Sequence, residues 1–418
     1  MFRKKGLIYL IVFNSLLISA QDKLKVSYRG LKRTKSAFIE KVSIIKDQTQ
    51  LDTVKIEKDL QNLIRLPSIA EASYRIETDS KTLKKRLVYD FVENHTLIPV
   101  FQLWTAVNQV SFRLGLKEFN LLGKYKEVGG FYQYNGFHSF GATYKDPFLF
   151  SNKLGVLVDT KRITTIEPLY KDDFRVEYQY TISSLQTGLL YQPTIQNSIY
   201  AGVTLFEEHY KYHSGTLFEG APFEYKPFKL LTNVSHDYYH LDYDYYFLEG
   251  WKNSTLAQLV PVSPDQSLFW TLSNDISYFK RWAKRGNWAT RLRVGFSNNN
   301  PTPFSAFAID NNQNIRGIGN LVQRASAVLA LNTEYRHTLF EKGWFVIQSN
   351  VFADLGAWRL SGNSFDDFTN QKNQAIFSGA GIRLIHKKIF NAILRIDYGF
   401  NLKEMNQSGL VFGIGQYF

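Results

Sequence analysis

Apolar and polar residues alternate along several segments in the last third of the chain. In residues 344–358 one parity is apolar, comprising Phe345, Ile347, Val351, Ala353, Leu355 and Ala357. The other parity is mainly polar and includes Gln348, Asn350, Asp354 and Gly356, with Phe352 among them. Successive side chains of a β-strand point to opposite faces, so this pattern predicts a strand with one apolar and one polar face. Strands of about ten residues with apolar outer and polar inner faces are what a transmembrane β-barrel requires.

We predict that residues 98–418 form one all-β, membrane-spanning antiparallel barrel of about sixteen strands. The middle of the chain alternates less regularly. There we place strands at 172–182, 184–192, 197–212 and 232–250, with long connections at 211–231 and 250–266. The segment 298–321 is rich in Asn, Pro and Gly and lies between two strong strands, so it predicts a long loop.

The first strand, 98–104, and the last, 410–418, are expected to pair and close the barrel, because an unpaired edge exposes a row of backbone groups. Four apolar residues of the last strand share one parity and are predicted to face lipid: Leu410, Phe412, Ile414 and Phe418. Phe418 is expected at the membrane border, as part of an aromatic girdle. Glycines at 409, 413 and 415 weaken this strand, which suits an opening seam and equally suits close packing.

Residues 22–94 follow a different pattern. A short apolar strand at 24–28 precedes two segments with helical spacing, the second of which is closed by Pro67. Two further strands follow at 69–78 and 83–93, joined by a turn at 79–81. The order β-α-α-β-β predicts a small α+β domain in front of the barrel.

The N-terminus and the composition indicate export. Arg3, Lys4 and Lys5 precede an apolar stretch too short to span a membrane, so residues 1–20 predict a secretory signal peptide. The chain has no cysteine, which excludes disulfides and thiolate metal sites. The net charge of +13 raises the possibility of a nucleic-acid partner, but the export signal argues against it; a polar lumen or a membrane rim accounts for the cations. The aromatic content of 16% fits the girdles of an outer-membrane barrel.

No pattern in the sequence predicts an enzyme, a cofactor site or a metal site. The pairs His209/His213 and His236/His240 are spaced for a helix, but on a strand residues four apart lie about 13 Å from each other. We interpret them as solvated or interfacial histidines. Gly379-Ala380-Gly381 lacks the strand-turn-helix context of a dinucleotide site, and no G-x-S-x-G elbow is present.

Several motifs in the expected order resemble the superfamily of BamA-type assembly factors and TpsB-type two-partner secretion transporters. Phe119–Gly123 and Asp146–Phe150 are similar to two early turns of that family. The segment Ile315, Arg316, Gly317 and Ile318 is similar to its V-R-G-F/Y loop motif, and 352–356, with Phe352, Asp354 and Gly356, to its F-x-D-x-G strand. The N-terminal domain resembles one POTRA domain; the alternative is a small α+β domain of no specific kind.

The resemblance implies that loop 298–321 folds into the lumen and that Arg316 pairs with Asp354, with Glu334 nearby. It also implies an outer-membrane protein of a Gram-negative cell, of the bacterial surface antigen type, with its N-terminal domain in the periplasm. The implied function is insertion and assembly of outer-membrane proteins. The alternatives are translocation of a polypeptide and a passive pore. The implied partners are outer-membrane lipid and lipopolysaccharide, unfolded β-barrel or secreted polypeptide clients, and accessory lipoproteins.

Overall fold

The computed structural model describes residues 25–47, 51–78, 85–106, 109–171, 174–194, 196–244, 246–262, 268–298, 306–311, 314–319, 323–390, 392–404 and 406–418, without the side chains of 102–106, 109–110 and 170–171. The expected signal peptide and the turn at 79–81 lie outside these residues. The chain divides into two compact units, residues 1–93 and 94–418.

The N-terminal unit is a three-stranded sheet with two helices. Its elements are β1 (Lys25–Arg29), α1 (Ser36–Val42), α2 (Thr53–Ile64), β2 (Ile69–Thr78) and β3 (Lys85–Glu93). The sheet order is β1-β3-β2, with β1 parallel and β2 antiparallel to β3. Asp52 caps α2 by accepting hydrogen bonds from the backbone N–H groups of Val54 and Lys55. The predicted order β-α-α-β-β is confirmed.

Two residues fix the chain as it leaves β1. Gly30 has a φ of +82°, and a Cβ there would lie 2.0 Å from the carbonyl oxygen of Phe91. The carboxylate of Glu93 then accepts hydrogen bonds from the backbone N–H groups of Lys32, Arg33 and Thr34 at 2.8–2.9 Å. Burial alone would raise the pKa of Glu93, but these bonds outweigh it and hold the pKa below its ordinary value.

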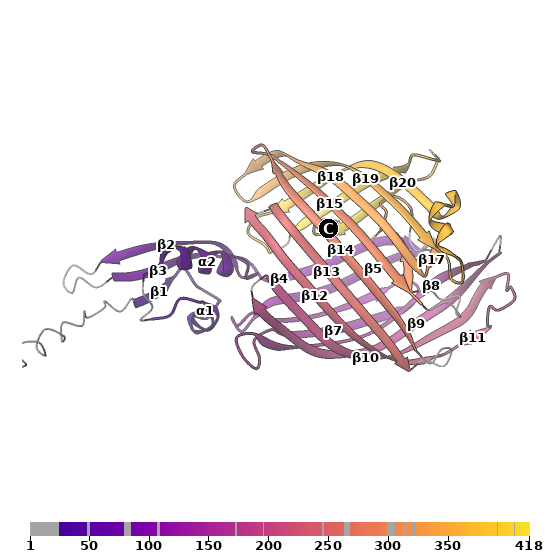
Figure 1. The fold of residues 1–418 in the computed structure, drawn as a ribbon, viewed down its shortest axis with the longest axis horizontal. Coiled ribbons are helices and arrows are strands. Elements are labelled where there is room, and N and C mark those ends of the chain that lie inside the picture. The colour runs from indigo at the N-terminus through magenta and orange to yellow at the C-terminus, as the bar shows by residue number, and fades with distance from the viewer. Residues whose placement is uncertain are drawn as a thin grey trace, which may run out of the picture. The chain divides into compact units, whose positions relative to one another are not determined.

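The second unit is a closed antiparallel barrel (Figure 1). Sixteen long strands and the two-residue β11 (Glu224–Tyr225) make up its described wall. The long strands are β4 (Leu97–Ala106), β5 (Gln109–Leu121), β6 (Lys126–Tyr134), β7 (His138–Asp146), β8 (Leu154–Lys171), β9 (Phe174–Thr194), β10 (Asn197–Gly215), β12 (Phe228–Asp244), β13 (Phe247–Val262), β14 (Phe269–Trp282), β15 (Gly286–Ser297), β18 (Ala327–Lys342), β19 (Phe345–Arg359), β20 (Gln374–His386), β21 (Ile393–Asn401) and β22 (Ser408–Ile414). None of the helices in the described ranges is long and apolar enough to cross a membrane.

The predicted barrel of about sixteen strands is confirmed, although two errors in the middle of the chain cancel. The described residues of the predicted strands 172–182 and 184–192 belong to the single 21-residue strand β9. The segment 232–250 is divided between β12 and β13, and β13 occupies most of the predicted connection 250–266. The cause is the length of β8, β9 and β10, whose far ends no longer alternate apolar with polar residues, so the period-two pattern does not mark their limits.

The two ends of the barrel differ in their connections. At one end, called the turn end here, short turns such as 283–285 and 343–344 join the strands. At the other, called the loop end, lie the long connections 216–227, 298–326 and 360–373. The connection 298–326 contains a small hairpin, β16 (Phe307–Ile309) with β17 (Gln323–Ala325), and the tip Ile315–Ile318.

Candidate functional site

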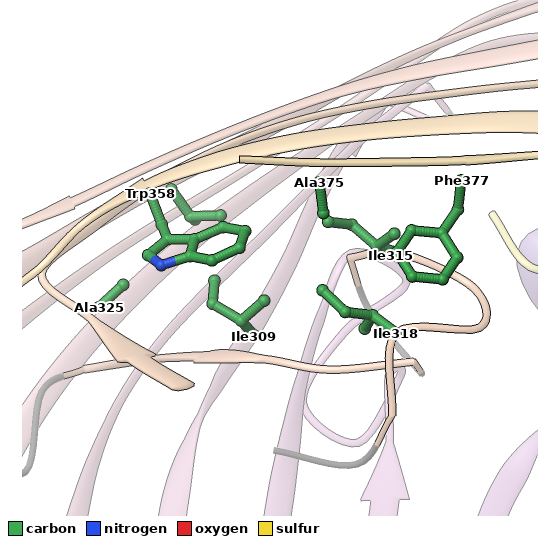
Figure 2. Packing of buried hydrophobic residues seen from close by; sticks show 8 residues of the cluster. Ile309, Ile315, Ile318, Ala325, Trp358, Ala375 and Phe377 are labelled. Atoms are coloured by element: carbon green, nitrogen blue, oxygen red, sulfur yellow. The ribbon is translucent and has the colours of Figure 1, made fainter. Parts of the chain in front are cut away.

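The tip of the loop 298–326 is held against the inner wall of the barrel by an apolar cluster. Ile309, Ile315 and Ile318 of the loop are buried against Trp358 of β19 and against Ala375 and Phe377 of β20 (Figure 2). Ile315 is 1% exposed and Phe377 is 0% exposed, so the contact excludes solvent. Burial of side chains of this size contributes about 1.5–3 kcal/mol each. The cluster therefore fixes the tip against the inner face of β18, β19 and β20.

Arg316 lies next to this cluster and reaches two carboxylates. Its Nε and Nη2 donate to the two oxygens of Asp354 at 2.8 and 2.9 Å, and its backbone N–H donates to the same carboxylate at 2.9 Å. Its Nη1 donates to Glu334. All three residues are essentially inaccessible to solvent. The structure thus brings together Arg316, Asp354 and Glu334 in a planar, two-pronged arrangement that matches the donor fork of an arginine.

Three more arginines extend this network along the wall. Arg336 donates to Glu334, while Nη1 of Arg383 donates to Asp397 at 2.7 Å. Asp397 also lies 3.5 Å from Nε of Arg395 and 3.9 Å from Nη1 of Arg316. Burial disfavours the charged form of Arg316, yet Glu334 and Asp354 outweigh it and raise its pKa above the ordinary value. Removing Arg316 would take its ion pair from the buried carboxylate of Asp354, whereas Glu334 and Asp397 would keep their other arginines.

The guanidinium of Arg316 also lies between two aromatic rings. Its central carbon is 3.8 Å from the ring centroid of Phe352 and 4.4 Å from that of Tyr417. Tyr417 in turn donates a hydrogen bond to the backbone oxygen of Asn311 in the loop, at 3.0 Å. This explains why Phe352, an apolar residue on the polar parity of its strand, points inward: its ring face is one wall of the arginine site.

A row of glycines lets the loop backbone lie directly on the wall. Three glycines lie side by side on neighbouring strands, in the row that begins at Phe352 of β19. Gly379 of β20 is opposite Phe352, Gly399 of β21 is opposite Gly379, and Gly409 of β22 is opposite Gly399. A Cβ at Gly399 would lie 2.5 Å from the carbonyl oxygen of Arg316, and one at Gly409 would lie 3.0 Å from that of Gly317. Gly317 itself has a φ of +94°. The loop tip therefore rests on the last two strands as well as on β19.

The prediction that Phe418 faces lipid in an aromatic girdle is wrong. The strand β22 ends at Ile414, and Gly415, with a φ of +86°, turns residues 415–418 into the lumen. Phe418 packs there on the buried cluster of Leu241, Phe279 and Ala289. Parity along the strand cannot be extended through a residue in the left-handed region, because the alternation of faces is lost at that point.

The other predicted seam residues do face outward. Leu410, Phe412 and Ile414 are 56%, 58% and 40% exposed on the outer face of β22. The strand next to β22 on one side is β21 and on the other is β4, which closes the barrel. With seven residues, β22 is the shortest of the sixteen long strands in the described wall.

Gly356 of β19, the last residue of the predicted F-x-D-x-G strand, lies under the loop tip. A Cβ at this position would be 2.3 Å from Ile315 Cδ1.

Sequence reasoning missed a second ion pair that ties the same loop to the opposite wall. Arg324 of β17 donates to Glu167 of β8, and both side chains are less than 20% exposed. The two residues are 157 positions apart, so no local spacing could have indicated the pair. The loop 298–326 is therefore anchored on β18 to β22 by Arg316 and on β8 by Arg324.

Solved structures share this architecture. A BamA from Haemophilus ducreyi lacking POTRA domains 1–3 matches 93% of this chain and 82% of its own, with a TM-score of 0.58 and 13% identity. CdiB from Escherichia coli matches 93% of this chain and 75% of its own, with a TM-score of 0.63 and 11% identity. CdiB from Acinetobacter baumannii matches 94% and 74%, with a TM-score of 0.59 and 12% identity.

No protein-family model matches the sequence, and no curated protein matches it. At identities of 11–13% the structural likeness establishes architecture, and it does so over more than nine-tenths of the chain. The protein has the fold of the BamA and CdiB barrels.

Proposed function

We propose that this protein is an outer-membrane barrel that assists the insertion and assembly of other outer-membrane proteins at the seam between β4 and β22. The observation that carries the proposal is the weakness of this seam. Its strand β22 has seven residues, contains Gly409 and Gly413, and turns away from the wall at Gly415. Each ladder hydrogen bond contributes about 0.5–1.5 kcal/mol, so a seven-residue edge opens more readily than the longer edges elsewhere.

An open seam would expose unpaired strand edges, which can template an incoming β-strand. The position of the loop tip supports this mechanism. Arg316 and Gly317 contact Gly399 of β21 and Gly409 of β22, and Tyr417 lies on the guanidinium of Arg316. If β22 moved away from its neighbours, the contacts of Arg316 and Gly317 with β22 and with Tyr417 would be lost. The same contacts stabilise β22 in its closed position.

The N-terminal unit is proposed to be a POTRA-like periplasmic domain that handles clients. Both β1 and β2 are edges of its sheet, and β2 is ten residues long. An edge of this length can accept an extended peptide by β-augmentation. Deleting residues 22–94 should leave a folded, heat-modifiable barrel without client handling; a deletion protein that assembles clients normally would contradict this role. Lipopolysaccharide and accessory lipoproteins are further proposed partners.

A disulfide across the seam tests the mechanism. The chain has no cysteine of its own, so the introduced cysteines can pair only with each other. Cysteines at Phe101 of β4 and at Leu410, Phe412 or Ile414 of β22 would be screened for the pair that crosslinks fully. The matched control joins Leu292 and Leu331, which are directly opposed on β15 and β18, away from the seam. We expect the seam lock to lower outer-membrane protein levels in cells that depend on this protein, and reduction to restore them. Full assembly activity in the locked protein would overturn the proposal.

Translocation of a polypeptide through the lumen is the second candidate. It is favoured by the polar inner wall and by a loop whose described ion pairs with the wall come from two residues, Arg316 and Arg324, so that it could leave as a unit. Under this function the seam lock is tolerated, while a lock that ties the loop to the wall blocks transport. A passive pore would show neither dependence, and its conductance would be unaffected by added clients.

A further inference from the structure

The outer surface of the barrel carries a groove on strands β7 to β12, away from the lumen and the seam. It encloses about 460 Å³ and is lined by residues of five neighbouring strands, among them Phe140, Arg162, Ser183, Glu207 and Phe228. The sheet register places these five side by side in one row: Phe140 is opposite Arg162, Arg162 opposite Ser183, Ser183 opposite Glu207, and Glu207 opposite Phe228. Residues opposed in this way share a face, which here is the outer one.

This row marks a border on the outer surface. One step toward the turn end, the next outward row consists of Ala142, Thr160, Leu185, Leu205 and Leu230. Leu185 and Leu205 are 49% and 43% exposed, as expected where acyl chains cover the wall. One step toward the loop end lie polar residues, including Thr181 and His209. The row Phe140–Phe228 thus lies where an apolar belt ends, and its two phenylalanines are 55% and 54% exposed.

Arg162 is unusual at this border. Among the described outward positions of β7 to β12, no other lysine or arginine lies in the row or in the apolar belt below it. Arg162 is exposed, and no carboxylate of the described residues forms an ion pair with it. Glu207 is two strands away, at about 10 Å, and is already paired with Lys226 at 3.3 Å. Lys161 also lines the groove, which therefore has a net positive charge, with the hydroxyl of Ser183 beside Arg162.

We propose that this groove binds the phosphate-bearing headgroup of a lipid in the membrane leaflet at the loop end. The guanidinium of Arg162 would hold the phosphate through its planar donor fork, and Ser183 would donate a further hydrogen bond; the hydroxyl of Thr160 already donates to the backbone oxygen of Ser184 at 3.1 Å. The acyl chains would lie along Leu185 and Leu205, and Phe140 and Phe228 would flank the headgroup. The charge indicates a phosphate, and the leucines of the row below it, Leu185, Leu205 and Leu230, indicate that the ligand is a lipid. The inference depends on the barrel lying in a membrane and is independent of whether it assembles or transports clients.

Native mass spectrometry of the full-length protein in detergent tests the site. The probe is lipid A, compared with the same lipid after enzymatic removal of its phosphates. We expect the wild type to retain one lipid A and Arg162→Gln to retain it about tenfold less well, with Arg162→Lys in between. The matched control is Lys211→Gln, since Lys211 is an exposed outward cation two rows closer to the loop end; it should retain lipid A as the wild type does.

Three outcomes would overturn the proposal. The first is equal retention of lipid A by Arg162→Gln and the wild type. The second is equal retention of the phosphorylated and dephosphorylated lipids. The third is loss of the bound lipid in millimolar inorganic phosphate, which would make the site one for a free anion. Heat-modified mobility of each variant on gels controls for folding, and the seam assay described above remains a separate measurement.

Discussion

Replacing Arg316 with alanine should be among the most destabilising single changes in the barrel. The substitution removes three side-chain hydrogen bonds to Asp354 and Glu334 and leaves both carboxylates buried beside Asp397. Breaking a buried ion pair by removing one partner costs about 3–5 kcal/mol. The contacts of the guanidinium with Phe352 and Tyr417 are lost as well. We therefore expect the free energy of unfolding to fall by about 3–5 kcal/mol.

The pairing itself is tested by a double-mutant cycle with Asp354→Asn. That single change should also be strongly destabilising, because the buried guanidinium of Arg316 loses its two-oxygen partner and keeps only its contacts with Glu334 and Asp397. The double variant should be no less stable than the worse single variant, since each change removes the same interaction. Urea unfolding in lipid vesicles, followed by tryptophan fluorescence, measures all three. Trp358 reports on the loop directly, because it packs on Ile309 and Ile315.

A control variant sets the scale. Arg175 pairs with Glu177 at the surface, and its side chain is 57% exposed. Arg175→Ala should therefore cost about 0–1 kcal/mol. Losses for Arg316→Ala and Asp354→Asn that simply add in the double variant would refute the pairing, as would a loss for Arg316→Ala no larger than that of the control.

Three further expectations follow from particular contacts. Gly399→Ala should free the loop tip, because the new Cβ would lie 2.5 Å from the backbone oxygen of Arg316, and limited proteolysis of residues 306–326 should accelerate; Gly130→Ala, whose Cβ would be 3.4 Å from its nearest neighbour, is the control. Phe418→Ser should lower the unfolding free energy by about 1–3 kcal/mol through lost packing on Phe279, without altering the outer face of the barrel; an unchanged unfolding midpoint would contradict the inward position. In the N-terminal unit, the lowered pKa of Glu93 stabilises the fold at pH values above the ordinary carboxyl pKa of 4.5, and this contribution should disappear as the pH falls through the lower folded pKa. Glu93→Gln should remove that part of the pH dependence in thermal unfolding scans.

The sequence predicts the barrel best where one face of each strand is apolar and the other polar. In β19 and β21 that contrast is strong, so the inward side of Asp354 and Asp397 follows from parity alone. The prediction fails in the long strands β8 to β10. Near the loop end these strands carry tyrosines such as Tyr178 and Tyr210 on the inner face, so an apolar or aromatic residue there does not indicate an outward position. The alternation comes from the apolar belt on the outer face of the barrel, and where a strand extends beyond this belt its outward positions no longer need to be apolar.

The candidate site divides in the same way. The partnership of Arg316 with Asp354 was indicated by motif resemblance and by the inward parity of Asp354, whereas the partnership of Arg324 with Glu167 had no signal in the sequence. Residues 415–418 were misplaced because one backbone angle, at Gly415, redirects everything that follows. A glycine at that position permits the turn but does not require it, so composition alone could not have decided between the two directions.

The enclosed position of the loop tip and of Tyr417 constrains the order in which this barrel can fold. Both are buried inside a wall whose first and last strands, β4 and β22, come from opposite ends of the barrel sequence. Closing so long a loop is entropically costly and slow, so this pairing is expected late. The loop tip must therefore reach its place in the lumen while the sheet is still open. Arg316 contacts the glycine row before β4 pairs with β22. The buried charge network then holds the end of the sheet at β22 in position for the final pairing with β4.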